Sequence, residues 1–163
     1  MTNPTSKFAP PGSPEELVLA WLRRARESQM SHYAMANRLS RRNQWIGIPV
    51  IVITAVVGTS AFASVLSDLV PIWAKVAAGA ASVLAAVLAS LQTFFKFSER
   101  AERHKTFAAK FGAIRRELET LHASGRATQE TSFVNVLREK LDRLAEEAPA
   151  VPVDVFQEIQ KLG

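Results

Sequence analysis

Two long apolar stretches interrupt a chain whose other residues are mostly polar and often charged. Residues 43–67 are 25 consecutive positions without a charged side chain, and residues 76–95 are another 20. A helix that crosses the roughly 30 Å hydrocarbon core of a bilayer needs about 20 mainly apolar residues. The pattern therefore predicts two membrane-spanning helices, at about residues 44–67 and 73–95.

The two predicted spans are joined by only a few residues. Ser67 and Asp68 are typical residues for a helix end or cap, and Pro71 suits the first turn of a helix. The spans are therefore expected to form a tight antiparallel hairpin. Trp45 and Trp73 fall near opposite membrane faces, where tryptophan often anchors a helix at the interface.

Basic residues flank the predicted hairpin. Arg41 and Arg42 precede the first span, and Lys96 follows the second, whereas the connection carries only Asp68 and the adjoining Lys75. Because cytoplasmic flanks carry an excess of Lys and Arg, both termini are expected in the cytoplasm. The formal net charge of +5 also suits nucleic acid, but the position of these residues beside the spans accounts for it without such a partner.

Apolar residues outside the spans recur at intervals of three and four, through residues 14–43 and again through residues 96–122. Positions at equal depth in a folded hairpin then face one another: Leu17 and Leu121, Trp21 and Leu118, Ser28 and Phe111, Met35 and His104, Leu39 and Ala101, and Ile46 and Phe94. Each span is therefore expected to continue as one long helix, the two forming an antiparallel cytoplasmic stalk. One hairpin unit over residues 13–124 results.

The two ends of the chain have different character. Residues 1–12 contain three Pro and one Gly and are expected to be a disordered tail. Residues 128–163 are expected to hold cytoplasmic helices, one from Thr131 to Ala148 and a shorter one from Pro152 to Leu162. The first places its apolar residues on one face: Phe133, Val136, Leu137, Leu141 and Leu144. The predicted fold class is an all-α membrane protein.

No catalytic or cofactor-binding motif can be recognised in the sequence. The absence of Cys excludes disulfides, thiolate catalysis and cysteine-ligated zinc. Phosphate-binding loops, dinucleotide fingerprints, nucleophile elbows and zinc-protease signatures are also missing. We therefore expect a protein that is not an enzyme and that carries no cofactor.

Small residues recur at every fourth position of the second predicted span. They are Ala74, Ala78, Ser82, Ala86 and Ser90, and Thr54 and Gly58 make one matching step on the first span. Such residues let helix backbones approach closely, which suits packing within the hairpin. The face is wider than one partner helix needs. It is therefore also a candidate for packing between subunits or, with Gln92, for bordering a narrow water path that only an oligomer can enclose.

Gly47 and Pro49 fall where the first stalk helix is expected to meet the membrane. Pro49 cannot donate a hydrogen bond to the carbonyl of Trp45, and its ring crowds that turn. The sequence therefore predicts a kink here. A static kink and a gating hinge both fit this pattern.

Two histidines, His32 and His104, fall on the predicted stalk seams at similar depth, near Met35. Three interpretations fit: polar packing in the seam, a response to pH or to a ligand involving Arg100, or a metal site completed by Glu99 or Glu102. Packing is the simplest of these.

Several short motifs, in their order around the hairpin, resemble the SLATT superfamily. They are Trp21, Ser28-Gln29, His32-Tyr33, residues 38–43 (RLSRRN), Gly47-Ile48-Pro49, Gln92-Thr93-Phe94-Phe95 and residues 98–104 (SERAERH). The resemblance covers about residues 17–121, and residues 141–149 are similar to the end of stand-alone members. Six residues match as framework positions rather than catalytic ones: Trp21, His32, Pro49, Glu99, Arg100 and His104.

The resemblance implies a two-transmembrane effector domain of the kind associated with nucleotide-second-messenger synthases and sensor domains in bacterial conflict systems. Such an effector would oligomerise and perforate or depolarise the bacterial inner membrane. No fused sensor or synthase is recognisable, so the signal is expected from a separate partner or from a ligand of the cytoplasmic helices. The basic stalk residues suit an anionic nucleotide or lipid headgroups. The alternative function is a non-conducting membrane scaffold that recruits partners through its cytoplasmic helices.

Overall fold

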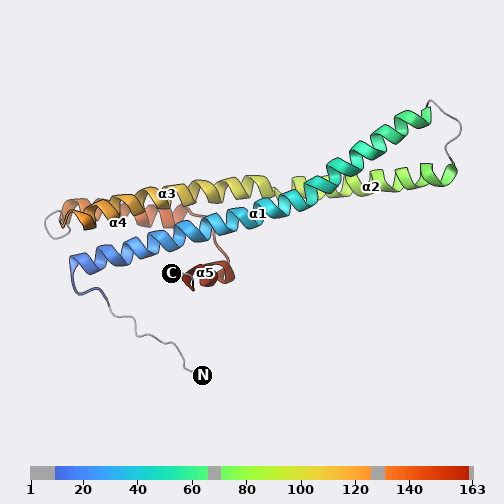
Figure 1. Cartoon of the computed structure of the whole chain (residues 1–163). Coiled ribbons are helices and arrows are strands. Elements are labelled where there is room, and N and C mark those ends of the chain that lie inside the picture. The colour runs from blue at the N-terminus through green and yellow to red at the C-terminus, as the bar shows by residue number, and fades with distance from the viewer. Residues whose placement is uncertain (1–9, 66–70, 126–130, 162–163) are drawn as a thin grey trace, which may run out of the picture. The chain divides into compact units, whose positions relative to one another are not determined.

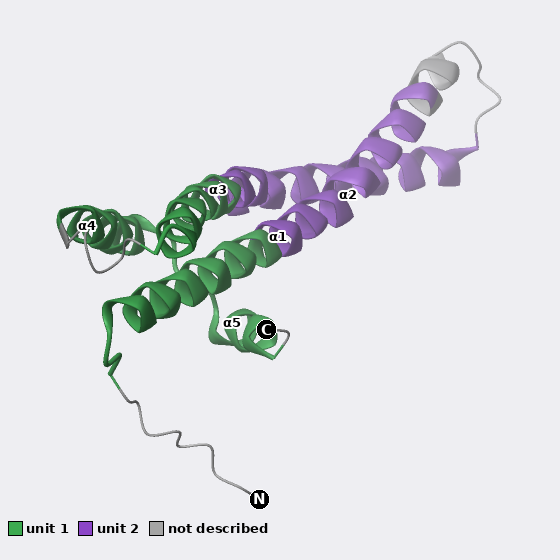
Figure 2. Ribbon diagram, turned by 60° about the vertical axis from the view of Figure 1, so that its left-hand side comes forward, with its two compact units in different colours: residues 1–35, 104–163 green, residues 36–103 purple. Residues whose placement is uncertain are grey.

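The computed structural model of the chain describes residues 10–65, 71–125 and 131–161, without the side chains of residues 60–65 and Thr131. These residues form five helices and no strand, so the predicted all-helical fold is confirmed for them. The helices are α1 (Pro14–Val65), α2 (Ile72–Phe95), α3 (Phe97–Ala123), α4 (Thr131–Glu147) and α5 (Val153–Gln160) (Figure 1). The helices belong to two compact units, unit 1 with residues 1–35 and 104–163 and unit 2 with residues 36–103 (Figure 2).

Helix α1 contributes to both units and is 52 residues long. The hydroxyl of Ser13 caps its first turn by accepting a hydrogen bond from the backbone N–H of Glu16 at 3.2 Å. Glu15 and Glu16 add negative charge at the positive end of the helix dipole. The helix continues without interruption through Pro49, so the predicted single long helix is present over residues 14–65, whereas its crossing of a membrane stays a prediction.

The second long helix, predicted to be continuous, is interrupted at Lys96. Helix α2 ends at Phe95, Lys96 adopts a left-handed conformation with φ 46° and ψ 41°, and α3 begins at Phe97. The break is a single residue wide, because the N–H of Lys96 donates to the carbonyl of Gln92 and its own carbonyl accepts from Arg100. The apolar period continues across residue 96, so the sequence pattern alone does not reveal the interruption.

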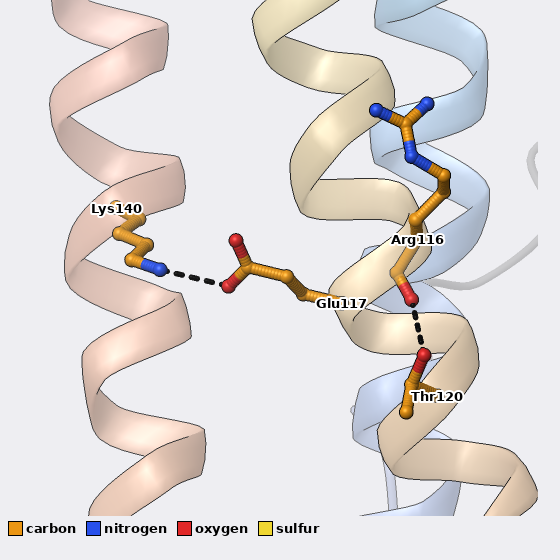
Figure 3. A network of polar contacts seen from close by, with 4 residues as sticks. All are labelled: Arg116, Glu117, Thr120 and Lys140. Atoms are coloured by element: carbon orange, nitrogen blue, oxygen red, sulfur yellow. Dashed lines mark hydrogen bonds and ion pairs between the residues drawn. The ribbon is translucent and has the colours of Figure 1, made fainter.

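The core of unit 1 is built by α1, α3 and α4. Its buried members are mostly Leu, Phe, Val and Ala: Val18, Ala25, Phe107, Phe111, Ile114, Leu118, Leu121, Val134, Leu137 and Leu144. Trp21, Leu22 and Leu141 are partly buried against them. On the exposed side of α3 and α4, Lys140 Nζ lies 2.7 Å from Glu117 Oε2, and Thr120 donates its hydroxyl proton to the Arg116 carbonyl (Figure 3).

The face that α4 buries differs from the predicted one. Val134 is buried, whereas Phe133 is 39% and Val136 46% exposed. Val134, Leu137, Leu141 and Leu144 follow a three-four-three spacing, which is one helix face, and Val136 lies beside it. In α5, Val155 is buried, and Phe156 and Ile159 are half-buried.

In unit 2, α1 and α2 are in direct contact. The side chain of Gln92 donates to Asn43 Oδ1 at 3.1 Å and lies against Gly47. By length and composition, one described helical stretch can cross a membrane: Ile72–Ala123, which takes α2 and α3 together and contains an 18-residue window of mean hydropathy 1.8. The far end of the first predicted span and the connection at residues 66–70 lie outside the described residues, as does most of the predicted N-terminal tail.

Candidate functional site

The two stalk histidines meet inside unit 1. His32 Nδ1 and His104 Nδ1 lie 2.9 Å apart, and the residues are 4% and 3% exposed. The His32 ring stacks on Phe111 with centroids 5.5 Å apart and on Phe107 with centroids 6.2 Å apart. A hydrogen bond between these two nitrogens needs one donor and one acceptor, so the two rings take opposite tautomers when both are neutral. His104 therefore lies opposite His32, one helical turn from the predicted partner Met35.

Burial sets the charge state of His32. Loss of water around the ring, and then the repulsion of a positive charge on His104, lower the pKa of His32 to about 4. An ordinary histidine titrates near pH 6.5. His32 is therefore neutral at physiological pH and gains a proton only in strongly acidic conditions.

The other residues grouped with the histidines are divided between the two units. Met35 is buried in unit 1, whereas Glu99 and Arg100 are exposed in unit 2. The carboxylate of Glu99 pairs with Lys96 Nζ at 3.3 Å. Among the described residues, no group of three or more His, Cys, Asp or Glu side chains is placed to hold a metal ion.

Gln92 forms a polar contact between α1 and α2 in unit 2. Its amide donates to Asn43, and a Cβ at Gly47 would lie only 3.0 Å from Gln92 Nε2. Glycine at position 47 therefore lets Gln92 reach across to α1. Pro49 lies two residues further along, inside the unbroken helix.

The small residues of α2 divide between two faces. Ala74 and Ala78 are half-buried, and the half-buried or buried surface then continues through Ala81, Ala85 and Ala89. Ser82, Ala86 and Ser90 are instead exposed. A residue four positions on is rotated by roughly 40° around the helix, so a strict four-residue column spirals away from the partner helix.

The exposed small residues have their polar groups satisfied within their own helix. Ser82 donates its hydroxyl proton to the Ala78 carbonyl at 2.9 Å, and Ser90 donates to Ala86 at 2.8 Å. Thr54 on α1 does the same with Val50, and a Cβ added at Gly58 would meet no heavy atom within 4 Å. Neither Thr54 nor Gly58 therefore takes part in close packing against α2.

A shallow hollow lies on the exposed face of α2. Ala86 and Ser90 are flanked by larger apolar side chains, and its volume is about 540 Å³. The flanking residues are Val83, Val87, Leu91 and Phe94. Small residues between apolar ridges provide a groove into which the ridge of another helix can fit.

Much of the surface of unit 2 is apolar. Large exposed side chains on α1 and α2 include Ile48, Ile51, Val52, Val56, Ile72, Val76, Val83, Leu84, Val87 and Phe94. The expected anchors Trp45 and Trp73 are 80% and 71% exposed, and Arg41, Arg42 and Lys96 are exposed as well. Large exposed apolar patches of this kind mark surfaces that contact lipid or another protein.

Comparison with known proteins assigns the family. A family model for a SMODS and SLOG-associating 2TM effector domain matches residues 19–154, which is most of the chain. The chain belongs to SMODS and SLOG-associating 2TM effector domain family 4. The resemblance inferred from the sequence motifs is thereby confirmed. The match includes both histidines, the small residues of α2 and all of α4.

Membership of this 2TM effector family describes the chain as a transmembrane effector domain. Neither the comparison with curated proteins nor that with solved structures finds a match. Sequence reasoning identifies the histidines but places His104 opposite Met35. It misses the close contact of Gly112 with Gln29, where a Cβ would lie 2.7 Å from Gln29 Nε2. A glycine inside a regular helical pattern is the available signal.

Proposed function

We propose that this effector domain inserts in the bacterial inner membrane as a two-span hairpin, with both termini in the cytoplasm, and assembles into an oligomer that permeabilises the membrane. The main observation in support of this proposal is the exposed hollow around Ala86 and Ser90 on α2. Two helices cannot enclose a water path, so conduction needs several copies of the chain. The hollow offers a surface on which another copy can pack closely.

Three exposed hydroxyl groups on α1 and α2 support insertion of this segment in lipid. The hydroxyls of Thr54, Ser82 and Ser90 each donate to a carbonyl of their own helix. These donors therefore have an acceptor even where the helix is surrounded by hydrocarbon, which offers none. Exposed tryptophans at Trp45 and Trp73 suit the two interfaces. Activation by a separate sensor or nucleotide-second-messenger system is part of the proposal, and the description of the family as SMODS and SLOG-associating supports it.

The experiment is ion flux through liposomes that contain the purified full chain, together with its oligomeric size in nanodiscs. Ala86→Leu fills the hollow and should shift the protein to smaller oligomers and reduce flux at least tenfold. The matched control is Ala77→Leu, an exposed alanine of α2 outside the hollow, which should leave both unchanged. A monomeric wild-type protein, or equal flux from the two variants, contradicts the proposal.

One observation favours a second function, a non-conducting scaffold that recruits partners. An open groove of about 500 Å³ runs along α3 and α4 in unit 1. It combines an apolar floor at Ile114 and Leu144 with basic and acidic residues such as Lys110 and Glu139. An oligomer that stays impermeable in the presence of its activator would favour this function.

A further inference from the structure

A second, more enclosed pocket lies in unit 1 between α1, α3 and α4. Its volume is about 270 Å³, close to the lower end of the range of ligand pockets, which is about 300–1,000 Å³. Ala25 and Phe111, both buried, form its floor. Trp21 and Leu141, both half-buried, form its walls. A pocket of this volume has room for one substituted aromatic ring.

Three exposed charged residues line the same pocket: Arg24 on α1 and Arg138 and Asp142 on α4. Arg138 and Asp142 are four residues apart and therefore share one face of their helix. Within the part of the chain that the structure describes, the side chains of these three residues form no hydrogen bond or ion pair.

Other charged residues of the same unit do pair. Lys140 contacts Glu117 at 2.7 Å, and Arg115 contacts Glu119 at 3.3 Å. The pocket thus differs from its surroundings, since two guanidinium groups and one carboxylate face it without partners among the described residues. The sum of their charges is positive, so an anion is the complementary ligand.

The side chains around the pocket also indicate what kind of group should carry the anionic charge of the ligand. The indole of Trp21 and the ring of Phe111 provide apolar aromatic surface, which favours a planar ring. A guanidinium group binds phosphate or carboxylate through two parallel hydrogen bonds. Ser28 and Asp142 add a hydroxyl and an acceptor for polar groups on the ring.

We propose that this pocket binds a small aromatic anion, a single planar ring that carries a phosphate or carboxylate group. The ring lies over Phe111 between Trp21 and Leu141, and the anionic group is held by Arg24 and Arg138. The proposal does not depend on membrane conduction, because every group that it uses lies in unit 1.

Trp21 provides the readout. The chain has three tryptophans, so Trp45→Phe and Trp73→Phe leave Trp21 as the single source of tryptophan fluorescence. The full chain in an uncharged detergent is titrated with 4-nitrophenyl phosphate, whose ring quenches indole fluorescence at short range. Parallel titrations use 4-nitrobenzoate, to separate phosphate from carboxylate, and uncharged 4-nitrophenyl glucoside. Inorganic phosphate is added as a competitor.

Saturable quenching is expected from at least one of the two anions, with tenfold weaker binding of the uncharged ring. Arg24→Gln with Arg138→Gln should weaken anion binding at least tenfold. The matched control, Arg23→Gln with Arg143→Gln, changes two arginines of the same helices outside the pocket and should shift affinity less than twofold. Ala145→Leu fills the pocket without removing charge and should also abolish saturable quenching.

Circular dichroism and the midpoint of thermal unfolding establish whether each variant is folded. If the variant with both pocket arginines replaced does not fold, Ala145→Leu decides whether the pocket binds the anion. Linear quenching by all three probes would overturn the proposal, because it indicates collision or partition into detergent. Equal affinities in the pocket and control arginine pairs would overturn it as well.

Discussion

Gly112 on α3 lies directly against the side-chain amide of Gln29 on α1, so that a Cβ at position 112 would lie 2.7 Å from Gln29 Nε2 and 3.1 Å from Gln29 Cδ. The Oε1 atom of Gln29 is buried and has no hydrogen-bond partner among the described residues. Glycine in mid-helix therefore allows α1 and α3 to approach closely in unit 1, at the expense of helix propensity.

This contact predicts a coupling between positions 112 and 29. Gly112→Ala gains about 1 kcal/mol of helix propensity, but it meets the Gln29 amide in the wild-type chain. We expect the substitution to be more favourable by about 1–2 kcal/mol in a Gln29→Ala background, measured as the free energy of unfolding in a double-mutant cycle. Gly79→Ala, where a Cβ meets nothing within 4 Å, should have the same effect in both backgrounds. If the changes in the free energy of unfolding at positions 112 and 29 are additive, the close contact between them does not affect stability.

The lowered pKa of His32 predicts acid sensitivity. The unfolded chain binds a proton near pH 6.5, whereas folded His32 binds one near pH 4, so unfolding takes up protons between these values. The contribution of His32 to stability is fully present above pH 6.5 and falls as the pH drops to 4, by about 3 kcal/mol. Chemical denaturation of the full chain in micelles, at a series of pH values, measures this decrease.

Two variants separate His32 from the other titrating groups. His32→Phe should reduce the decrease between pH 6.5 and 4, because no imidazole remains to take up the proton at that position. His122→Gln changes an exposed histidine at the end of α3 and should retain the wild-type decrease. An unchanged pH profile in His32→Phe would assign the acid sensitivity to other groups.

The left-handed conformation of Lys96 predicts an inverted preference between glycine and alanine. In a regular helix Gly is less stable than Ala by about 1 kcal/mol, whereas a left-handed residue with a Cβ is strained by about 1–2 kcal/mol. Lys96→Gly should therefore be more stable than Lys96→Ala by about 1 kcal/mol, as measured by thermal unfolding. Both variants lose the exposed contact with Glu99, so its small contribution cancels. The opposite order would indicate a continuous helix through residue 96.

The face that α4 buries predicts which of two neighbouring valines matters. Val134 is 8% exposed and belongs to the core, whereas Val136 is 46% exposed. Val134→Ala should reduce the free energy of unfolding by about 1–2 kcal/mol, and Val136→Ala by less than about 0.5 kcal/mol. Chemical denaturation measures both, and similar losses would place α4 in a different rotation.

Most of the helices can be predicted from the sequence pattern because their signals are local. Ser13, Pro14, Glu15 and Glu16 mark the start of α1, and Pro149 follows the end of α4 at Glu147. The interruption at Lys96 carries no such signal, since lysine disfavours the left-handed conformation and the surrounding apolar period does not change.

The site can be predicted in outline. The three-four spacing brings His32 and His104 onto facing helices, but a shift of one turn separates Met35 from His32, and helix periodicity alone does not resolve one turn. The sequence places the small residues of α2 in one column, whereas helix rotation divides Ala78 from Ala86. The pocket at Trp21 and Arg138 could not be predicted, because it depends on how α4 folds back against α1 and α3.

The hydroxyls of Ser82 and Ser90 donate to carbonyls of their own helix and so need no acceptor from lipid or from a neighbouring copy. A copy of the chain alone in lipid and a copy packed against its neighbours then have the same polar bonds, so assembly breaks none of them. Under the proposed function, assembly would begin at a threshold number of copies per membrane area. Binding of a signal would shift the equilibrium between single copies and the oligomer. A higher expression level would then promote assembly in the same way as the signal does.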